Sequence, residues 1–131
     1  MTGVQTCALP IYFTNTHFED GCARYWSNSI SVSLRQTPIG MLSTFFHEIG
    51  HLHCWEHKLW KSYHVGRPLS LLNAEEKKKY IRTALKAERW VDDWAKKEMR
   101  KHFPNLPYIA SYDDHTGEIF LKKIKKTLNV Q

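Results

Sequence analysis

Two histidines and a glutamate in the first half of the chain have the spacing that a bound metal ion requires. They belong to the segment His47-Glu48-Ile49-Gly50-His51, an H-E-x-x-H. Residues four apart on a helix lie about one turn apart on the same face, so His47 and His51 can bind one metal ion. Glu48 then lies beside the pair, where it can accept a proton from a metal-bound water. The motif therefore predicts metal-assisted hydrolysis with Glu48 as the general base.

The residues around the motif predict the helix that it needs. Thr37-Pro38 is typical of an N-cap and a first helical residue, because proline lacks an N–H that would be unpaired there. Gly50 costs about 1 kcal/mol relative to alanine inside a helix, which indicates that another element approaches closely. We expect one helix from Pro38 to near Lys61, with an apolar face formed by Leu42, Phe45, Ile49, Leu52 and Leu59.

Catalytic zinc sites use three protein ligands, and Glu88 is the first candidate for the third. It belongs to a set of residues that share one helical face: Ile81, Leu85, Glu88, Asp92, Ala95 and Met99. A carboxylate on an otherwise apolar face is costly unless it is paired or binds a metal. The spacing therefore favours Glu88 as a ligand, and Asp92 could accept the free ring N–H of a ligating histidine.

His57 is the alternative third ligand. Its spacing from His51 equals that in the H-E-x-x-H-x-x-G-x-x-H zinc proteases, in which a glycine turns the chain. This sequence has Cys54 at the glycine position. If the helix continues through Cys54, His57 points away from the other two histidines, and Cys54 itself is more typical of a small buried thiol. We expect the remaining histidines to be surface or packing residues: His17, His53, His64, His102 and His115.

The rest of the chain predicts an α+β domain. Residues 12–16 could form a short strand, and Ile30–Leu34 alternates apolar and polar residues as a half-buried strand does. Asn73 and Glu76 have the spacing of a capping box, which predicts a long helix that ends near Lys101, before Pro104. Asp113-Asp114 could cap a last helix, whose apolar face would carry Ile119, Phe120, Ile124 and Leu128, with Lys122, Lys123, Lys125 and Lys126 around it.

Residues 1–11 look foreign to this domain. They resemble the translation of a common sequencing-adapter oligonucleotide joined to a truncated reading frame. We therefore exclude them from the expected fold, as one excludes a cloning scar. The expected single domain covers residues 12–131, with its core over residues 28–102 and a basic C-terminal helix over residues 114–129. In that case Cys7 has no structural role.

Composition bears on location and partners. Three cysteines are an odd, sparse set that favours a reducing cytosol, and no stretch approaches the roughly 20 apolar residues of a membrane span. We therefore expect a cytoplasmic protein.

The net charge is +6, and 14 of the 19 basic residues lie from residue 75 onward, against 9 acidic residues. This asymmetry could favour nucleic acid or an acidic partner. We prefer a solvated helix face, because no aromatic-rich nucleic-acid motif accompanies the lysines.

The two motifs together resemble those of the ImmA/IrrE-like metallopeptidases, small zincin domains of phages, mobile elements and bacteria. The segments 46–52 and 88–95 correspond to the family patterns H-E-[LI]-G-H and E-x-x-A-[ND]-x-[FW]-A, and the resemblance covers about residues 28–100. Val91 replaces the usual alanine, the segment between the motifs is longer than expected, and no helix-turn-helix segment is evident. The resemblance implies Zn²⁺ held by His47, His51 and Glu88, with Glu48 as general base and Asp92 behind the ligands. It also implies regulated cleavage of a protein, often a DNA-binding repressor.

The sequence thus predicts a small zincin-like α+β domain. A short antiparallel sheet would pack on the metal-binding helix, and a second long helix would supply Glu88. The expected activity is zinc-dependent hydrolysis of a peptide bond in a protein or peptide substrate. The alternative is a non-catalytic, zinc-stabilised module that binds nucleic acid, or a phage or host protein, through its basic C-terminal half. The candidates for a group that stabilises the oxyanion are Tyr80, Tyr108, Tyr112 and His64.

Overall fold

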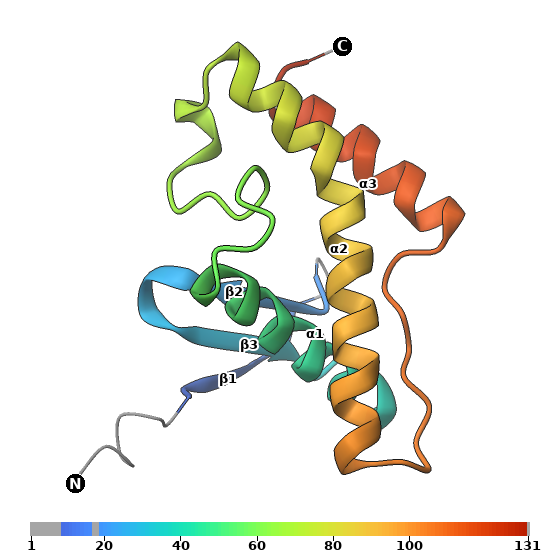
Figure 1. The fold of residues 1–131 in the computed structure, drawn as a ribbon. Helices are drawn as coiled ribbons and strands as arrows, with labels where there is room; N and C mark the ends of the chain where they lie inside the picture. The colour runs from blue at the N-terminus through green and yellow to red at the C-terminus, as the bar shows by residue number, and fades with distance from the viewer. Residues whose placement is uncertain (1–8, 17–18, 131) are drawn as a thin grey trace, which may run out of the picture.

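The computed structural model describes residues 9–16 and 19–130 of the 131-residue chain. Within these ranges the elements follow in the order β1 (Ile11–Thr14), β2 (Gly21–Arg24), η2 (Tyr25–Ser27, a 3-10 turn), β3 (Ser29–Ser33), α1 (Pro38–Glu56), η3 (Leu69–Leu71, a second 3-10 turn), α2 (Ala74–His102) and α3 (Asp114–Thr127). α1 lies between the sheet and the lower half of α2, and α3 lies beside the upper half of α2 (Figure 1). The predicted α+β class is confirmed. Among the described residues, no helix has both the length and the hydropathy of a membrane span.

The segment predicted to be a foreign leader lies mostly outside the described residues, because the description begins at residue 9. Leu9 packs beside the core of the sheet. The carbonyl oxygen of Pro10 accepts the N–H of Ile30 at 3.1 Å, and Ile11 begins β1. Residues 9–11 therefore lie against the sheet.

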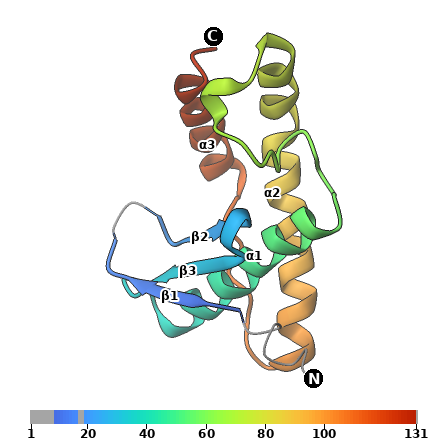
Figure 2. The same cartoon turned by 90° about the vertical axis from the view of Figure 1, so that its left-hand side faces the viewer.

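The sheet is mixed, so the prediction of an antiparallel sheet is wrong. β3 lies in the centre, with β1 parallel to it on one side and β2 antiparallel on the other (Figure 2). The chain thus passes from one edge of the sheet to the other before it returns to the middle. The sequence did not predict β2, because Gly21-Cys-Ala-Arg24 lacks the alternation of a half-buried strand.

β3 is buried along its whole length, not on one face as predicted. Ile30 and Val32 pack with Leu52 of α1. The serines between them, Ser29, Ser31 and Ser33, are each 2% exposed. Ser33 donates its hydroxyl to the carbonyl oxygen of Thr16 at 2.8 Å. β3 is therefore buried although its sequence alternates, because strands flank it on both sides and its polar side chains are short.

α1 begins where predicted but ends before Lys61. Thr37 caps it, because its Oγ1 accepts the N–H of Gly40 at 3.1 Å. At the other end Lys58 has a φ of 56°, and the N–H of Leu59 donates to the carbonyl oxygen of Cys54 at 2.8 Å. This is the hydrogen-bond pattern of a Schellman motif, which usually contains a glycine at the left-handed position. The lysine gives no such signal, and Leu59 lies outside the helix.

α2 begins with the predicted capping box. The side chain of Asn73 accepts the N–H of Glu76 at 2.9 Å, and the Glu76 carboxylate accepts the N–H of Asn73 at 3.0 Å. The helix ends at His102, close to the predicted position. It approaches α1 closely at Gly50, where a Cβ would lie 2.8 Å from Cγ1 of Val91. The predicted close approach at Gly50 is therefore confirmed.

α3 begins with a capping box between Asp113 and Thr116, as the predicted cap requires. Ile124 of α3 and Leu128, the residue after its end, pack with Leu72, Tyr80 and Ala84. Ile119 is 52% exposed and does not belong to this face, contrary to the prediction. The helix stops at Thr127, slightly before the predicted end.

Candidate metal centre

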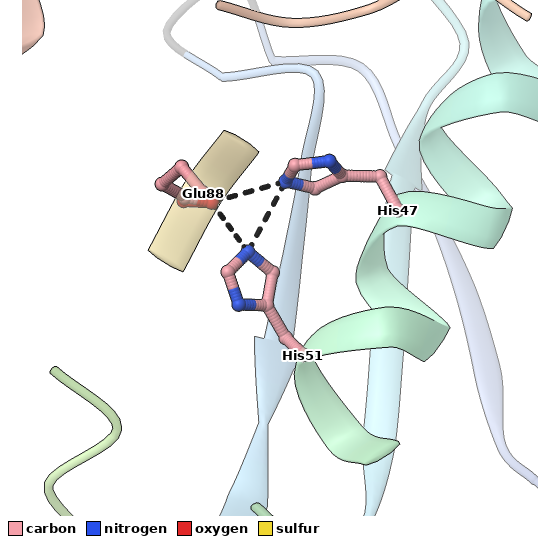
Figure 3. Close-up of side chains that lie close together, drawn as sticks. All are labelled: His47, His51 and Glu88. Atoms are coloured by element: carbon pink, nitrogen blue, oxygen red, sulfur yellow. Dashed lines mark hydrogen bonds and ion pairs between the residues drawn. The ribbon is translucent and has the colours of Figure 1, made fainter. Parts of the chain in front are cut away.

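Three buried side chains from two helices meet at one point. His47 and His51 project from α1 and Glu88 from α2, and none is more than 6% exposed (Figure 3). Oε1 of Glu88 lies 3.1 Å from Nε2 of His47 and 2.6 Å from Nε2 of His51, and the two nitrogen atoms are 3.1 Å apart. Three ligand-type atoms this close together could hold one metal ion. The structure therefore brings together the three residues that the sequence favoured as ligands.

Asp92 holds His47 through the other ring nitrogen. Oδ1 of Asp92 lies 2.9 Å from Nδ1 of His47 and accepts the hydroxyl of Tyr108 at 2.6 Å, while Oδ2 accepts the backbone N–H of Ser111 at 3.1 Å. Both Asp92 oxygens accept hydrogen bonds from other groups, so a proton on Nδ1 of His47 suits this contact. In the neutral ring the Nε2 lone pair then faces Glu88 and His51. A cation at this point would satisfy all three groups.

His64 is the corresponding partner of His51. It is 4% exposed, and its Nε2 lies 2.9 Å from Nδ1 of His51. Burial and the nearby charge of His51 lower the pKa of His64 to about 4, so its ring is neutral near pH 7. The sequence predicted a surface or packing residue, whereas His64 lies directly behind a candidate ligand.

Tyr63, the neighbour of His64, contacts Glu88, the third candidate ligand. Its hydroxyl donates to Oε2 of Glu88 at 3.1 Å, and its ring packs on Tyr80 with centroids 4.9 Å apart. The carbonyl oxygen of Trp60 accepts the backbone N–H groups of Tyr63 and His64, both at 2.9 Å. One tight turn after α1 therefore supplies a partner for Glu88 and a partner for His51. Sequence reasoning missed both, because this turn has no periodic pattern.

The charges in the cluster depend on one another. Burial disfavours the ionised form of Glu88, but the charge of His51 and hydrogen bonds from both histidines hold its pKa well below its usual range. Burial also opposes charge on His47, yet hydrogen bonds with Asp92 and Glu88 raise its pKa to about 10. Glu88 likewise raises the pKa of His51 against the effect of burial. Without a metal ion, protons on His47 and His51 compensate the negative charge of the buried Glu88 carboxylate. A divalent cation could supply this positive charge instead.

Glu48 borders a hollow of about 200 Å³ beside the cluster. It is 6% exposed, and its carboxylate makes no hydrogen bond or ion pair with any residue that the structure describes. Burial raises the pKa of Glu48, and the charges of His51 and His47 oppose the rise. Strand β2 passes close by, since a Cβ at Gly21 would lie 3.0 Å from Cγ of Glu48. The arrangement suits transfer of a proton to or from a small molecule in the hollow.

The four candidates for an oxyanion donor occupy different places. Tyr108 donates to Asp92, His64 lies behind His51, and Tyr80 belongs to the core between α2 and α3. Of these four residues, Tyr112 lines the hollow, and its hydroxyl has no hydrogen-bond partner among the described residues. Burial, together with the charges of Glu88 and Glu48, raises the pKa of Tyr112, so the hydroxyl keeps its proton.

His57, the alternative third ligand, lies away from the centre. It is an exposed residue at the end of α1, its Nδ1 is 3.0 Å from the carbonyl oxygen of His53, and the two rings stack at 4.2 Å. Cys54 is fully buried, and burial and the charge of Glu88 raise its pKa to about 12. It therefore stays a thiol, in agreement with the buried thiol expected from the sequence.

Comparison of the chain with protein-family models, with curated proteins and with solved structures finds no match.

Proposed function

We propose that this chain is a zinc-dependent metallopeptidase that hydrolyses a peptide bond in a protein or peptide substrate. The observation that carries the proposal is the position of Glu48. The residue is 6% exposed, its carboxylate has no partner among the described residues, and it lines a hollow next to two candidate ligands. A structural metal site would have all its positions closed by protein, and a buried carboxylate without a partner would only cost stability there. A hydrolase needs such a group beside an accessible metal.

The donor set fits zinc. Two imidazole nitrogens and one carboxylate oxygen, from His47, His51 and Glu88, match the His₂Glu set of catalytic zinc sites. The partners Asp92 and His64 supply the outer contacts that such sites use to orient ligating histidines. When bound, zinc would polarise the scissile carbonyl group and lower the pKa of a coordinated water toward about 7.

The side chains of the protein account for the other steps. Glu48 accepts a proton from the attacking water and returns it to the leaving amine, a task for which a raised carboxyl pKa is suited. Asp92 and Tyr63 keep His47 and Glu88 in position. The hydroxyl of Tyr112 is available to donate a hydrogen bond to the oxygen on which negative charge develops.

Strand β2 supports a peptide as the substrate. It is an edge strand, and its residues Gly21, Cys22 and Ala23 line the hollow that contains Glu48. An extended peptide can pair with the outer edge of such a strand through main-chain hydrogen bonds. The resemblance to ImmA/IrrE-like metallopeptidases adds a substrate class to the proposal: a regulatory protein of the cytoplasm, such as a DNA-binding repressor.

Glu48→Gln tests the proposal. Zinc-loaded protein is incubated with a proteome-derived peptide library, and new N-termini are identified by mass spectrometry. We expect the variant to bind one zinc and to unfold near the wild-type temperature, while cleavage falls by about 100-fold or more, because a general base contributes roughly 10²–10⁴ to the rate. Glu56→Gln, at an exposed glutamate of the same helix, is the matched control and should cleave as the wild type does. A zinc-loaded wild type that produces no new termini, or an equally active Glu48→Gln, would reject the peptidase.

The alternative function rests on the surface of α3. Lys122, Lys123, Lys125 and Lys126 are exposed, and none forms an ion pair with a described residue. In this alternative the metal only stabilises the fold, and the lysines bind nucleic acid or a phage or host protein. Reversing the four charges would then abolish binding to a labelled DNA duplex, Glu48→Gln would not, and the affinity would fall steeply with salt.

A further inference from the structure

A second and larger hollow adjoins the one that contains Glu48. Its volume is about 500 Å³, and it shares the side chains of Tyr25 and Tyr63 with the smaller hollow at the metal centre. Tyr63 donates its hydroxyl to Glu88, so one wall of the larger hollow is in direct contact with a candidate ligand. A substrate bound at the centre would therefore extend into this space within a residue or two of the bond that is cleaved.

The walls of the larger hollow are mainly aromatic and aliphatic. They include Tyr25, Trp26, Tyr63, Val65, Leu69 and Tyr80. Arg67 is the charged side chain among the lining residues, and it pairs with Glu76. Trp26 is also a lining residue and is 82% exposed, so most of its large apolar ring faces solvent. Apolar hollows of this size with aromatic walls are typical of sites that bind an apolar group.

We propose that this hollow, which we call the aromatic subsite, binds one large apolar side chain of the substrate close to the scissile bond. The inference rests on the proposed peptidase function and adds a substrate class to it: peptides with Phe, Tyr, Trp, Leu or Met within two residues of the cleaved bond. Tyr25 and Tyr63 form the boundary with the centre, and Trp26 covers the outer side of the bound group. An acidic side chain has no free cation to meet among the lining residues, because Arg67 is already paired.

Cleavage specificity is the first test. Aligned cleavage sites from the peptide library should show one position, within two residues of the bond, at which large apolar residues exceed alanine and aspartate by about 10- to 100-fold in kcat/KM, a range typical of apolar pockets. Trp26→Ala should remove most of this preference. Leu71→Ala is the matched control, since Leu71 is 66% exposed and lines neither hollow, and its profile should equal that of the wild type. Equal cleavage of all side chains, or an unchanged preference in Trp26→Ala, would overturn the subsite.

A binding measurement separates the subsite from the peptidase. The zinc-loaded Glu48→Gln variant is titrated with N-acetyl-phenylalaninamide or N-acetyl-alaninamide and followed by NMR through the indole N–H signal of Trp26. We expect the phenylalanine compound to shift this signal with at least tenfold higher affinity than the alanine compound. If it does, but the wild type cleaves nothing, the subsite stands and the peptidase is rejected. If the wild type cleaves peptides but the phenylalanine compound does not shift Trp26, the subsite is rejected and the peptidase stands.

Discussion

A metal-binding histidine has to present one ring nitrogen to the metal and keep the other in place. For His47 the second requirement is met by Asp92, which accepts from the ring, from Tyr108 and from the backbone of Ser111. These three contacts use both oxygens of Asp92 and fix the carboxylate. In the proposed function Asp92 is therefore a positioning residue, and its effect should appear first in metal affinity.

Replacing Asp92 by asparagine should weaken zinc binding by about 10- to 100-fold, the range found when the partner of a ligating histidine is changed. Asparagine keeps an acceptor for Nδ1 of His47 but puts an N–H₂ donor where Oδ2 accepts from Ser111. A competition titration with a chromophoric chelator measures the affinity. Asp93→Asn changes the same side chain at the exposed neighbouring position and should leave the affinity unaltered. Equal affinities for the two variants would show that Asp92 does not hold the ligand.

At the scale of the elements, the distance between α1 and α2 decides whether the centre can form. His47 and His51 lie on α1 and Glu88 lies on α2. Even a small increase in the distance between the two helices would therefore break the cluster. Gly50 sits between the two histidines in sequence and meets Val91 and Trp94 of α2. Its missing side chain is therefore what lets the two helices approach.

Gly50→Ala should destabilise the fold, although alanine is normally favoured over glycine inside a helix by up to about 1 kcal/mol. The added Cβ would lie 2.8 Å from Cγ1 of Val91, and overpacking of this kind costs about 1–3 kcal/mol. The variant should also bind zinc more weakly, because α2 has to move outward with Glu88. Urea unfolding of the metal-free protein and a zinc titration measure the two effects.

The double variant Gly50→Ala with Val91→Ala is the control for this explanation. Shortening Val91 makes room for the new methyl group, so the loss of unfolding free energy should be smaller than the sum of the two single losses. Strict additivity would mean that the contact with Val91 is not the cause of the loss.

The elements that the sequence predicted are those encoded by neighbouring residues. Thr37 and Asn73 cap their helices through side chains that form hydrogen bonds within one turn. Glu88 and Asp92 are two acidic residues on the otherwise apolar face of a single helix. The end of α1 was not predicted, because Lys58 takes the left-handed conformation without the usual glycine. The parallel pairing of β1 with β3 was not predicted either, because local sequence patterns do not indicate which strands pair when they are distant in the sequence.

The residues that contact the candidate ligands also fall into two groups, those that the sequence could predict and those that it could not. Asp92 could be found because it lies one turn after Glu88 on the same helix. Tyr63 and His64 lie in the connection between α1 and α2, where no periodicity indicates which side chains turn inward. Only the path of the chain after α1, stabilised by hydrogen bonds to the carbonyl oxygen of Trp60, brings them to the centre.

At the scale of the whole molecule, the candidate centre joins parts that otherwise have separate cores. One core lies between the sheet and α1, a second between α1 and the C-terminal half of α2, and a third between α2 and α3. The candidate ligands come from α1 and α2. Asp92 of α2 contacts His47, the connection before α2 supplies His64 and Tyr63, and Ser111 of the connection after α2 contacts Asp92. A metal ion bound there would act as a cross-link between these parts, so its effect should extend to global stability.

Zinc should raise the unfolding temperature, and by more as the pH rises from 6.5 to 8.5. In the metal-free protein the pKa of His47 is raised from its usual 6.5 to about 10. Protonation of His47 therefore stabilises the metal-free fold fully below pH 6.5, and this contribution is lost as the pH rises through 10. Zinc needs the neutral ring, so it has to displace this proton, and its affinity should rise by up to about tenfold per pH unit for each proton displaced.

The increment in unfolding temperature at a fixed concentration of free zinc measures this competition. Binding to the folded state adds about 2.7 kcal/mol when free zinc is 100 times its Kd and about 4.1 kcal/mol at 1,000 times, so a tenfold gain in affinity should be visible in one melting curve. His57→Ala removes an exposed histidine outside the centre and should follow the wild type. Glu88→Ala should lose most of the increment at every pH. An increment that stays constant or falls with pH in the wild type would mean that zinc does not displace a proton from His47, and that the metal binds elsewhere.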